Sequence, residues 1–131
     1  IFDMIRVLLV GCGHMGSALL NEWINLKSHS LTVVDPLSYN SLRKKYYKNK
    51  LRFFDKTPNQ NDIKKFDIII FAIKPQIANK VLSEYRNFEF KKNILIASIV
   101  AGKKISFFKK NIKNANQIVR VMPNMPALIG E

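Results

Sequence analysis

The stretch at residues 5–16 reads IRVLLVGCGHMG, and it decides the class of fold. Its first half is a short apolar run that predicts a buried strand over Ile5–Val10. Its second half, residues 11–16, matches the pattern G-x-G-x-x-G, and apolar residues then recur at helical spacing as far as Lys27. A glycine loop that follows a strand and opens a helix is the context in which this pattern binds a dinucleotide.

Each glycine of the loop has its own physical task in such a site. Gly11 permits the tight turn, Gly13 lets a pyrophosphate approach the backbone, and Gly16 lets the helix pack closely against the strand. The helix N-terminus adds free N–H groups and a partial positive charge. The alternative is a glycine-rich turn that binds no ligand.

The residues between the glycines are predicted to meet the cofactor through their backbone. On that ground Cys12, His14 and Met15 belong to the binding loop, with the Met15 side chain expected in the core. A cysteine at a helix N-terminus can have a lowered pKa, and His14 has the chemistry of an acid. Both stand at variable positions of the pattern, however, which favours the plain loop role.

Asp35 lies 19 residues after Gly16, at the end of the second predicted strand. A carboxylate there accepts hydrogen bonds from the hydroxyls of the adenosine ribose and repels a 2′-phosphate. Asp35 is therefore assigned to the cofactor site, and NAD is favoured over NADP. Arg43 and Lys44 stand further on and are able to serve a 2′-phosphate. The competing interpretation of Asp35 is a turn starter before Pro36.

Apolar runs alternate with amphipathic stretches along the rest of the chain. Further strands are predicted at residues 31–34, 51–54, 67–73, 94–100 and 117–122. Helices are predicted at residues 38–48, within 56–65, and at 76–86 and 105–112, with Ser38 as the candidate N-cap of the first. This alternation predicts an α/β fold, a Rossmann-like doubly wound parallel sheet with helices on both faces, in one domain over residues 1–131.

The composition excludes several other classes. The formal net charge is +13, but the lysines are scattered and arginine is scarce, so no nucleic-acid partner is expected. No apolar run approaches the ~20 residues of a membrane span. Cys12 is the only cysteine, so no disulfide and no metal cluster are expected, and a cytoplasmic setting is the simplest.

Four segments in order resemble pyrroline-5-carboxylate reductase. They read GCGHMG at 11–16, AIKP at 72–75, SIVAG at 98–102 and RVMPNMPA at 120–127. The first is shared with many dehydrogenases, whereas the Met-Pro-Asn-x-Pro-Ala portion of the last is specific to this family. The similarity runs over nearly the whole chain.

The resemblance extends the predicted cofactor site beyond the glycine loop. It implies that the segment after the fourth strand lies along the cofactor and that small residues after the fifth strand admit the nicotinamide or the substrate. It also assigns one asparagine to the adenosine side and another to the region of the reacting ring. These residues are Ala72, Ile73, Lys74, Pro75, Ala101, Gly102, Asn59 and Asn124.

The sequence departs from the family pattern at three positions. Met125 replaces the usual threonine, Val100 replaces a common alanine, and Asp35 stands where many NADP-using members carry an uncharged residue. The first two departures leave undecided which contacts these positions make to the substrate. The third puts a preference for NADP in doubt.

The implied reaction is hydride transfer from NAD(P)H to the C=N bond of 1-pyrroline-5-carboxylate, giving L-proline in proline biosynthesis. No catalytic residue and no metal ligand are nominated. Family members continue into a helical C-terminal domain that dimerises and completes the substrate pocket, so the full-length form is expected to be a homo-oligomer. Residues 1–131 are expected to bind the cofactor with little activity by themselves. The alternatives are a non-catalytic NAD(P)-binding regulatory domain and a related G-x-G-x-M-G dehydrogenase.

Overall fold

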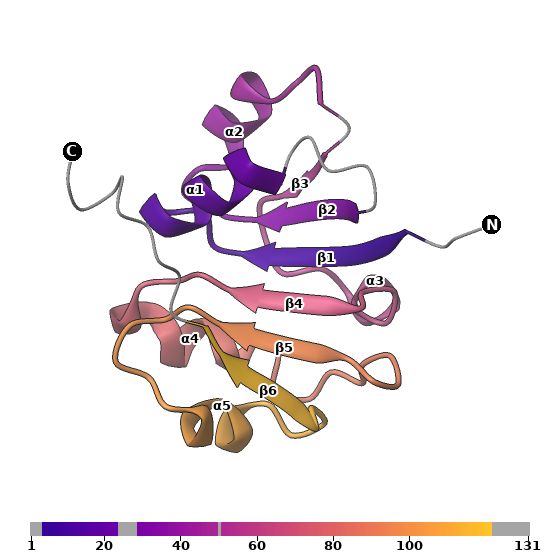
Figure 1. Cartoon of the computed structure of the whole chain (residues 1–131), viewed down its shortest axis with the longest axis vertical. Coiled ribbons are helices and arrows are strands. Elements are labelled where there is room, and N and C mark those ends of the chain that lie inside the picture. Colours follow the sequence, from indigo (N-terminus) through magenta and orange to yellow (C-terminus); the bar gives the residue numbers. More distant parts are fainter. Residues whose placement is uncertain (1–3, 24–28, 50, 122–131) are drawn as a thin grey trace.

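The computed structural model describes residues 4–23, 29–49 and 51–121, and its centre is a parallel sheet (Figure 1). The sheet has the strand order β3-β2-β1-β4-β5-β6, and every neighbouring pair is parallel. The strands are β1 Ile5–Val10, β2 His29–Val34, β3 Arg52–Phe54, β4 Ile68–Phe71, β5 Leu95–Ser98 and β6 Gln117–Arg120. This is the order of the doubly wound dinucleotide-binding fold, so the predicted α/β class is confirmed.

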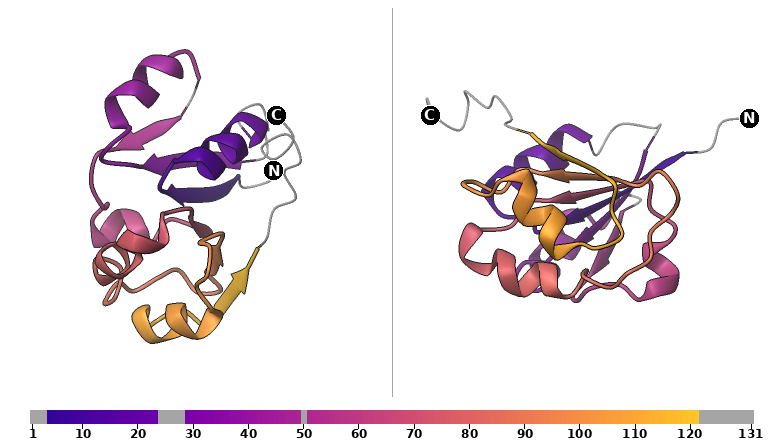
Figure 2. Two further views of the ribbon diagram at one scale, coloured as in Figure 1. Left: turned by 90° about the vertical axis from the view of Figure 1, so that its left-hand side faces the viewer. Right: turned by 90° about the horizontal axis from the view of Figure 1, so that it is seen from below.

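Helices cover both faces of this sheet (Figure 2). The helices are α1 His14–Trp23, α2 Tyr39–Lys45, α3 Gln60–Ile63, the 3₁₀ turn η1 Pro75–Ile77, α4 Ala78–Ser83 and α5 Ile105–Asn111. Apolar side chains of α1 and α2 pack on one face, and those of α3, α4 and α5 pack on the other. No helix within the described ranges is long and apolar enough to cross a bilayer.

Alternation of side chains along the strands explains the two cores. Leu8 and Val10 of β1 face the cluster built around Phe71, whereas Val7 and Leu9 face the cluster beneath α1. Both sets are almost fully buried. A strand that is apolar on both faces belongs in the interior of a parallel sheet, as its sequence predicted.

Element boundaries differ from the predicted ones where tertiary pairing sets them. β2 begins two residues earlier than predicted, because its ladder with β1 pairs His29 with Ile5. β4 ends at Phe71, two residues before the predicted end at Ile73. Ser38 stands at the N-cap position of α2, but its side chain makes no capping hydrogen bond.

Tyr85 is a fully buried aromatic side chain whose hydroxyl has no hydrogen-bond partner among the described residues. Its ring packs edge-on against Phe71 at 5.1 Å between centroids. Burial raises the pKa of Tyr85 above its ordinary value, so the hydroxyl is neutral at pH 7.

Tyr85→Phe should leave stability unchanged or raise it by up to ~1 kcal/mol, because a buried hydroxyl without a partner carries an uncompensated desolvation cost. Urea unfolding followed by circular dichroism measures this. A loss of 1 kcal/mol or more would show that the hydroxyl is hydrogen-bonded in solution.

Asp67 links the starts of β1 and β4 to the turn before β5, at the edge of the sheet where the strands begin. Its carboxylate accepts hydrogen bonds from the Arg6 backbone N–H at 2.9 Å and from Lys91 Nζ at 2.6 Å. Partial burial opposes ionisation of Asp67, but these two hydrogen bonds outweigh it and lower its pKa. The folded state therefore favours the charged carboxylate.

Because the pKa of Asp67 is lower in the folded state, its carboxylate should stabilise the fold at any pH above its unfolded-state pKa of about 4. This stabilisation should be lost as the pH falls through the folded-state pKa. Asp67→Asn should cost about 1 kcal/mol at pH 7, since the carboxylate is partly exposed. The stabilities of variant and wild type should converge as the pH falls below about 4. Asp55→Asn, which changes an exposed carboxyl group, is the matched control. A difference between Asp67→Asn and wild type that did not depend on pH would contradict this account.

Candidate functional site

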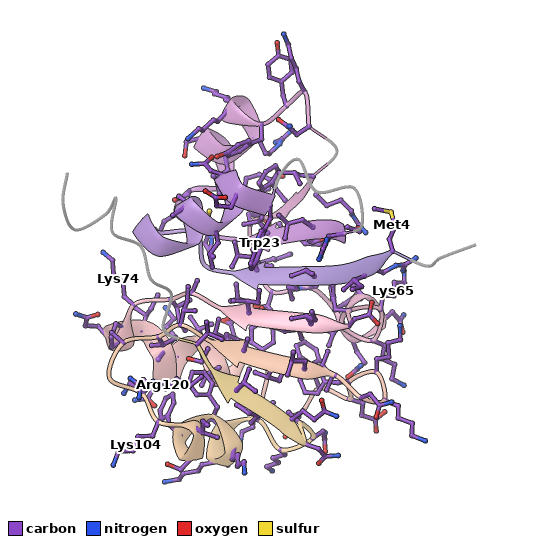
Figure 3. The ribbon with its side chains drawn as sticks, viewed as in Figure 1. Met4, Trp23, Lys65, Lys74, Lys104 and Arg120 are labelled. Atoms are coloured by element: carbon purple, nitrogen blue, oxygen red, sulfur yellow. The ribbon has the colours of Figure 1, made fainter. Side chains whose placement is uncertain are left out.

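The candidate site lies at the edge of the sheet where the strands end. β1 and β4 are neighbours there, although the chain passes from β1 to β2 and β3 on one side before it returns to β4 on the other. Ligands of doubly wound folds bind in the crevice at this reversal of strand order. The loops after β1, β4 and β5 meet this edge, and Figure 3 shows the Lys74 side chain there, while Met4 and Lys65 lie at the opposite edge.

The first glycine of the loop is required by both conformation and contact. Gly11 has φ +88°, in the left-handed region. A Cβ at Gly11 would stand 2.7 Å from the Ala72 carbonyl oxygen and 2.8 Å from Ile73 Cγ2. The turn after β1 therefore touches the end of β4, and two segments assigned separately to the cofactor site are neighbours.

The third glycine lets α1 begin directly against this turn. A Cβ at Gly16 would stand 2.9 Å from the Gly11 carbonyl oxygen and 3.5 Å from Ala72 Cβ. The close approach agrees with the steric role predicted for Gly16 from the pattern. It directs the N-terminus of α1 toward the strand ends.

Gly13 differs from the other two because it is exposed and has open space beside it. A Cβ at Gly13 would meet no described atom within 4 Å, and its φ lies outside the left-handed region. The first hydrogen bond inside the helix runs from the Ser17 N–H to the Gly13 carbonyl at 2.8 Å. The N–H groups before Ser17 are thus left over at the helix start, which suits an anionic group.

The backbones of His14 and Met15 open α1, and their side chains lie outside the structural description. Two of the backbone N–H groups that precede Ser17 belong to these residues. That these two N–H groups contact the cofactor remains a prediction.

Cys12 is buried within the loop and packs against the start of α1. Its Sγ lies 3.6 Å from Ser17 Oγ, and the Ser17 hydroxyl donates to the Cys12 carbonyl at 3.2 Å. Burial raises the pKa of the Cys12 thiol, so it is neutral at pH 7. A neutral, buried thiol is a poor nucleophile, which argues against the reactive-cysteine alternative. The predicted contact of the Cys12 backbone with the cofactor remains a prediction.

Asp35 follows β2 and is bonded to the backbone of two loops. Its Oδ2 accepts from the Cys12 N–H at 2.8 Å. Its Oδ1 accepts from the N–H groups of Leu37 at 3.1 Å and Ser38 at 3.2 Å. Sequence reasoning anticipated the turn around Pro36 and missed the bond to Cys12, because no local pattern signals a contact between residues 23 positions apart.

The segments after β4 and β5 complete the same edge. The Ala72 N–H bonds to the Val10 carbonyl at 2.8 Å, which keeps this segment beside the glycine turn. Lys74 is exposed, as are Ala101 and Gly102, and Gly102 has φ +71°. The structure therefore brings together the assigned residues of three loops on one open edge.

Of the two assigned asparagines, the structure describes only Asn59, and it does not place that residue within this group. The Asn59 side chain caps α3 by accepting from the Asp62 N–H at 2.9 Å, and α3 lies beside the start of β4 (Figure 1). The Asn59 side chain is thus used within its own turn, and the predicted contact of Asn59 with the adenosine side of the cofactor remains a prediction. Asn124 and its neighbours Pro123 and Met125 lie outside the described residues.

The described residues on this edge can bind and orient a ligand, but no acid–base pair occurs among their described side chains. No group of three or more metal-ligating side chains occurs in the described part of the chain. A hollow of about 950 Å³ lies at the opposite edge of the sheet, lined by residues that include Arg6, Arg52 and Lys91. None of the residues assigned to the cofactor site lines this hollow.

Comparisons with known proteins place these features in a family. Residues 6–102 match the family described as NADP oxidoreductase, coenzyme F420-dependent. A pyrroline-5-carboxylate reductase of Methanosarcina acetivorans is 30% identical over 129 residues, which cover 96% of this chain and 46% of that protein. Pyrroline-5-carboxylate reductase 1 of Bacillus subtilis is 28% identical, with 99% of this chain and 44% of that protein covered.

Solved structures give the same picture. The pyrroline carboxylate reductase of Plasmodium falciparum, with NADP bound, superposes with a TM-score of 0.71 at 30% identity, over 98% of this chain and 47% of that one. A pyrroline-5-carboxylate reductase of Coxiella burnetii gives a TM-score of 0.78 at 22% identity, over 97% and 47%, and supports the fold. The chain spans about half the length of the proteins that it matches.

Proposed function

The chain belongs to the family of NADP oxidoreductases described as coenzyme F420-dependent, and we propose that it binds a nicotinamide dinucleotide at the loop of residues 11–16. The observation that carries this proposal is the geometry of that loop. Gly11 and Gly16 are packed against each other and against the segment after β4, while a Cβ at Gly13 would meet no described atom within 4 Å. A pyrophosphate fits such a place, because it needs a close approach to N–H groups and no intervening side chain.

The residues of the chain would bind and orient the cofactor. The backbone N–H groups from Gly13 to Gly16 would hold the pyrophosphate at the start of α1. The segment at residues 72–75 would line the cofactor, with the exposed Lys74 adding positive charge, and Ala101 and Gly102 would leave room for the nicotinamide ring. When bound, the nicotinamide supplies the hydride, and the protein supplies position and electrostatics.

We further propose that the reaction is reduction of the C=N bond of 1-pyrroline-5-carboxylate to L-proline. The relatives from Methanosarcina and Bacillus support it, since both are named for this activity and match nearly the whole chain. NADP is bound in the Plasmodium relative, and for this chain both NADH and NADPH are candidate donors. In the longer form, a further domain would close the substrate pocket and form the oligomer.

A chimera tests the reaction directly. The matched 129 residues of the Methanosarcina reductase would be replaced by the corresponding residues of this chain. We expect the chimera to oxidise NADPH or NADH only when 1-pyrroline-5-carboxylate is present, and to lose this activity with Gly13→Val. A folded chimera that binds dinucleotide without turnover would favour the second candidate, a non-catalytic regulatory domain.

Residues 1–131 assayed by themselves should bind dinucleotide and reduce 1-pyrroline-5-carboxylate negligibly. Gly13, Lys74, Ala101 and Gly102 are all exposed, so substrate would meet the nicotinamide without the positioning that can contribute ~7–11 kcal/mol in favourable cases. Substrate-dependent oxidation of NADH or NADPH measures this. Turnover near that of a full-length relative would show that these residues already form a complete site.

A further inference from the structure

The end of β2 holds two consecutive peptide groups of the glycine loop. The Val34 carbonyl accepts from the Gly11 N–H at 2.8 Å, and Asp35 Oδ2 accepts from the Cys12 N–H at 2.8 Å. A carboxylate offers about four positions for hydrogen bonds. Three of them are filled here by backbone N–H groups, one from the glycine loop and two from the turn that precedes α2.

The backbone of Cys12 is consequently held at both its N–H and its carbonyl, which belong to two successive peptide groups. Asp35 holds its N–H, and the Ser17 hydroxyl donates to its carbonyl. This arrangement removes the Cys12 N–H from the groups that can reach a phosphate. It also sets the direction in which the chain enters Gly13 and the start of α1.

We propose that Asp35 is a positioning residue of the phosphate loop. It sets the affinity for the pyrophosphate instead of selecting between an adenosine ribose with and one without a 2′-phosphate. The inference rests on the proposed function, and it differs from the expectation that Asp35 recognises a ribose. NADH and NADPH share the same pyrophosphate. A change that loosens the Cys12 peptide must therefore weaken both by a similar factor.

Asp35→Asn separates the two roles. The amide retains one oxygen for Leu37 and Ser38, but its NH₂ group would oppose the Cys12 N–H, donor against donor. Affinities for NADH and NADPH should each fall about tenfold, with their ratio changed less than twofold. Asp55→Asn removes an exposed carboxylate just after β3, at the same edge of the sheet, and should change neither affinity. Tighter binding of NADPH together with weaker binding of NADH in Asp35→Asn would overturn the proposal.

Amide hydrogen exchange tests the bond without any ligand. In the wild type, the Cys12 and Gly11 amides should be protected to a similar degree, a comparison that needs no variant. Asp35→Asn should speed exchange at Cys12 at least tenfold and leave Gly11, bonded to the Val34 carbonyl, unchanged. An unprotected Cys12 amide in the wild type would overturn the proposal. Failure of the wild type to bind either dinucleotide would refute the proposed function, while exchange at Cys12 would still decide whether Asp35 holds the loop.

Discussion

Gly13→Val should weaken dinucleotide binding about 100-fold, or ~2.7 kcal/mol, and leave the fold intact. Gly13 is exposed, its φ lies outside the left-handed region, and a Cβ there meets no described atom within 4 Å. The free protein therefore has room for the valine side chain. The branched side chain would occupy the space through which the pyrophosphate must approach the backbone.

Fluorescence titration with NADH and NADPH measures this loss, and thermal unfolding checks the fold. Gly13→Ala provides a graded comparison, because its single methyl group should reduce affinity less than valine does. A valine variant that melts like the wild type and binds both dinucleotides with unchanged affinity would show that the loop is not part of the cofactor site.

Gly11→Ala should destabilise the fold by about 3 kcal/mol and lower the melting temperature by about 10 °C. The left-handed φ of +88° accounts for part of this cost. The remainder comes from the methyl group, which would overlap the Ala72 carbonyl oxygen at 2.7 Å and Ile73 Cγ2 at 2.8 Å. The first of these atoms is backbone, so relief requires movement of the chain after β4.

Gly13→Ala is the matched control for this prediction as well, since it adds the same methyl group two residues away in open space. The melting temperature of that variant should stay within about 2 °C of the wild type. The two variants thus separate a glycine needed for folding from one needed for binding. Equal melting temperatures for Gly11→Ala and the wild type would contradict the observed contact with β4.

The order of strands and helices was predictable because it rests on local patterns. Short apolar runs such as Ile68–Phe71 favour buried parallel strands, and the glycine loop fixes where the first helix begins. The ends of elements were less predictable. The start of β2 depends on pairing with Ile5, and the end of β4 coincides with the contact between residues 72–73 and Gly11.

The candidate site also has features that were predictable from the sequence and features that were not. Three glycines and the segments at 72–75 and 101–102 were assigned from motif and resemblance, and the structure brings the described ones to one edge. The hydrogen bond between the Cys12 N–H and Asp35 could not be predicted, because a carboxylate at the end of β2 looks the same in sequence whether it faces a ribose or the Cys12 N–H. Asn59 was assigned by resemblance, whereas its position before Gln60–Ile63 supplies a local reason for capping a helix.

The central claim is that residues 11–16 form the dinucleotide site, and titration of ¹⁵N-labelled wild-type chain with NADPH and NADH tests it most directly. The account predicts saturable shifts of the backbone amides of Gly13 and Gly16 and of residues 72–74 and 101–102, with little change at Arg6, Arg52 and Lys91 on the opposite edge. A folded chain that shows no saturable shifts at the glycine loop, or whose shifts gather around Arg6, Arg52 and Lys91, would contradict it.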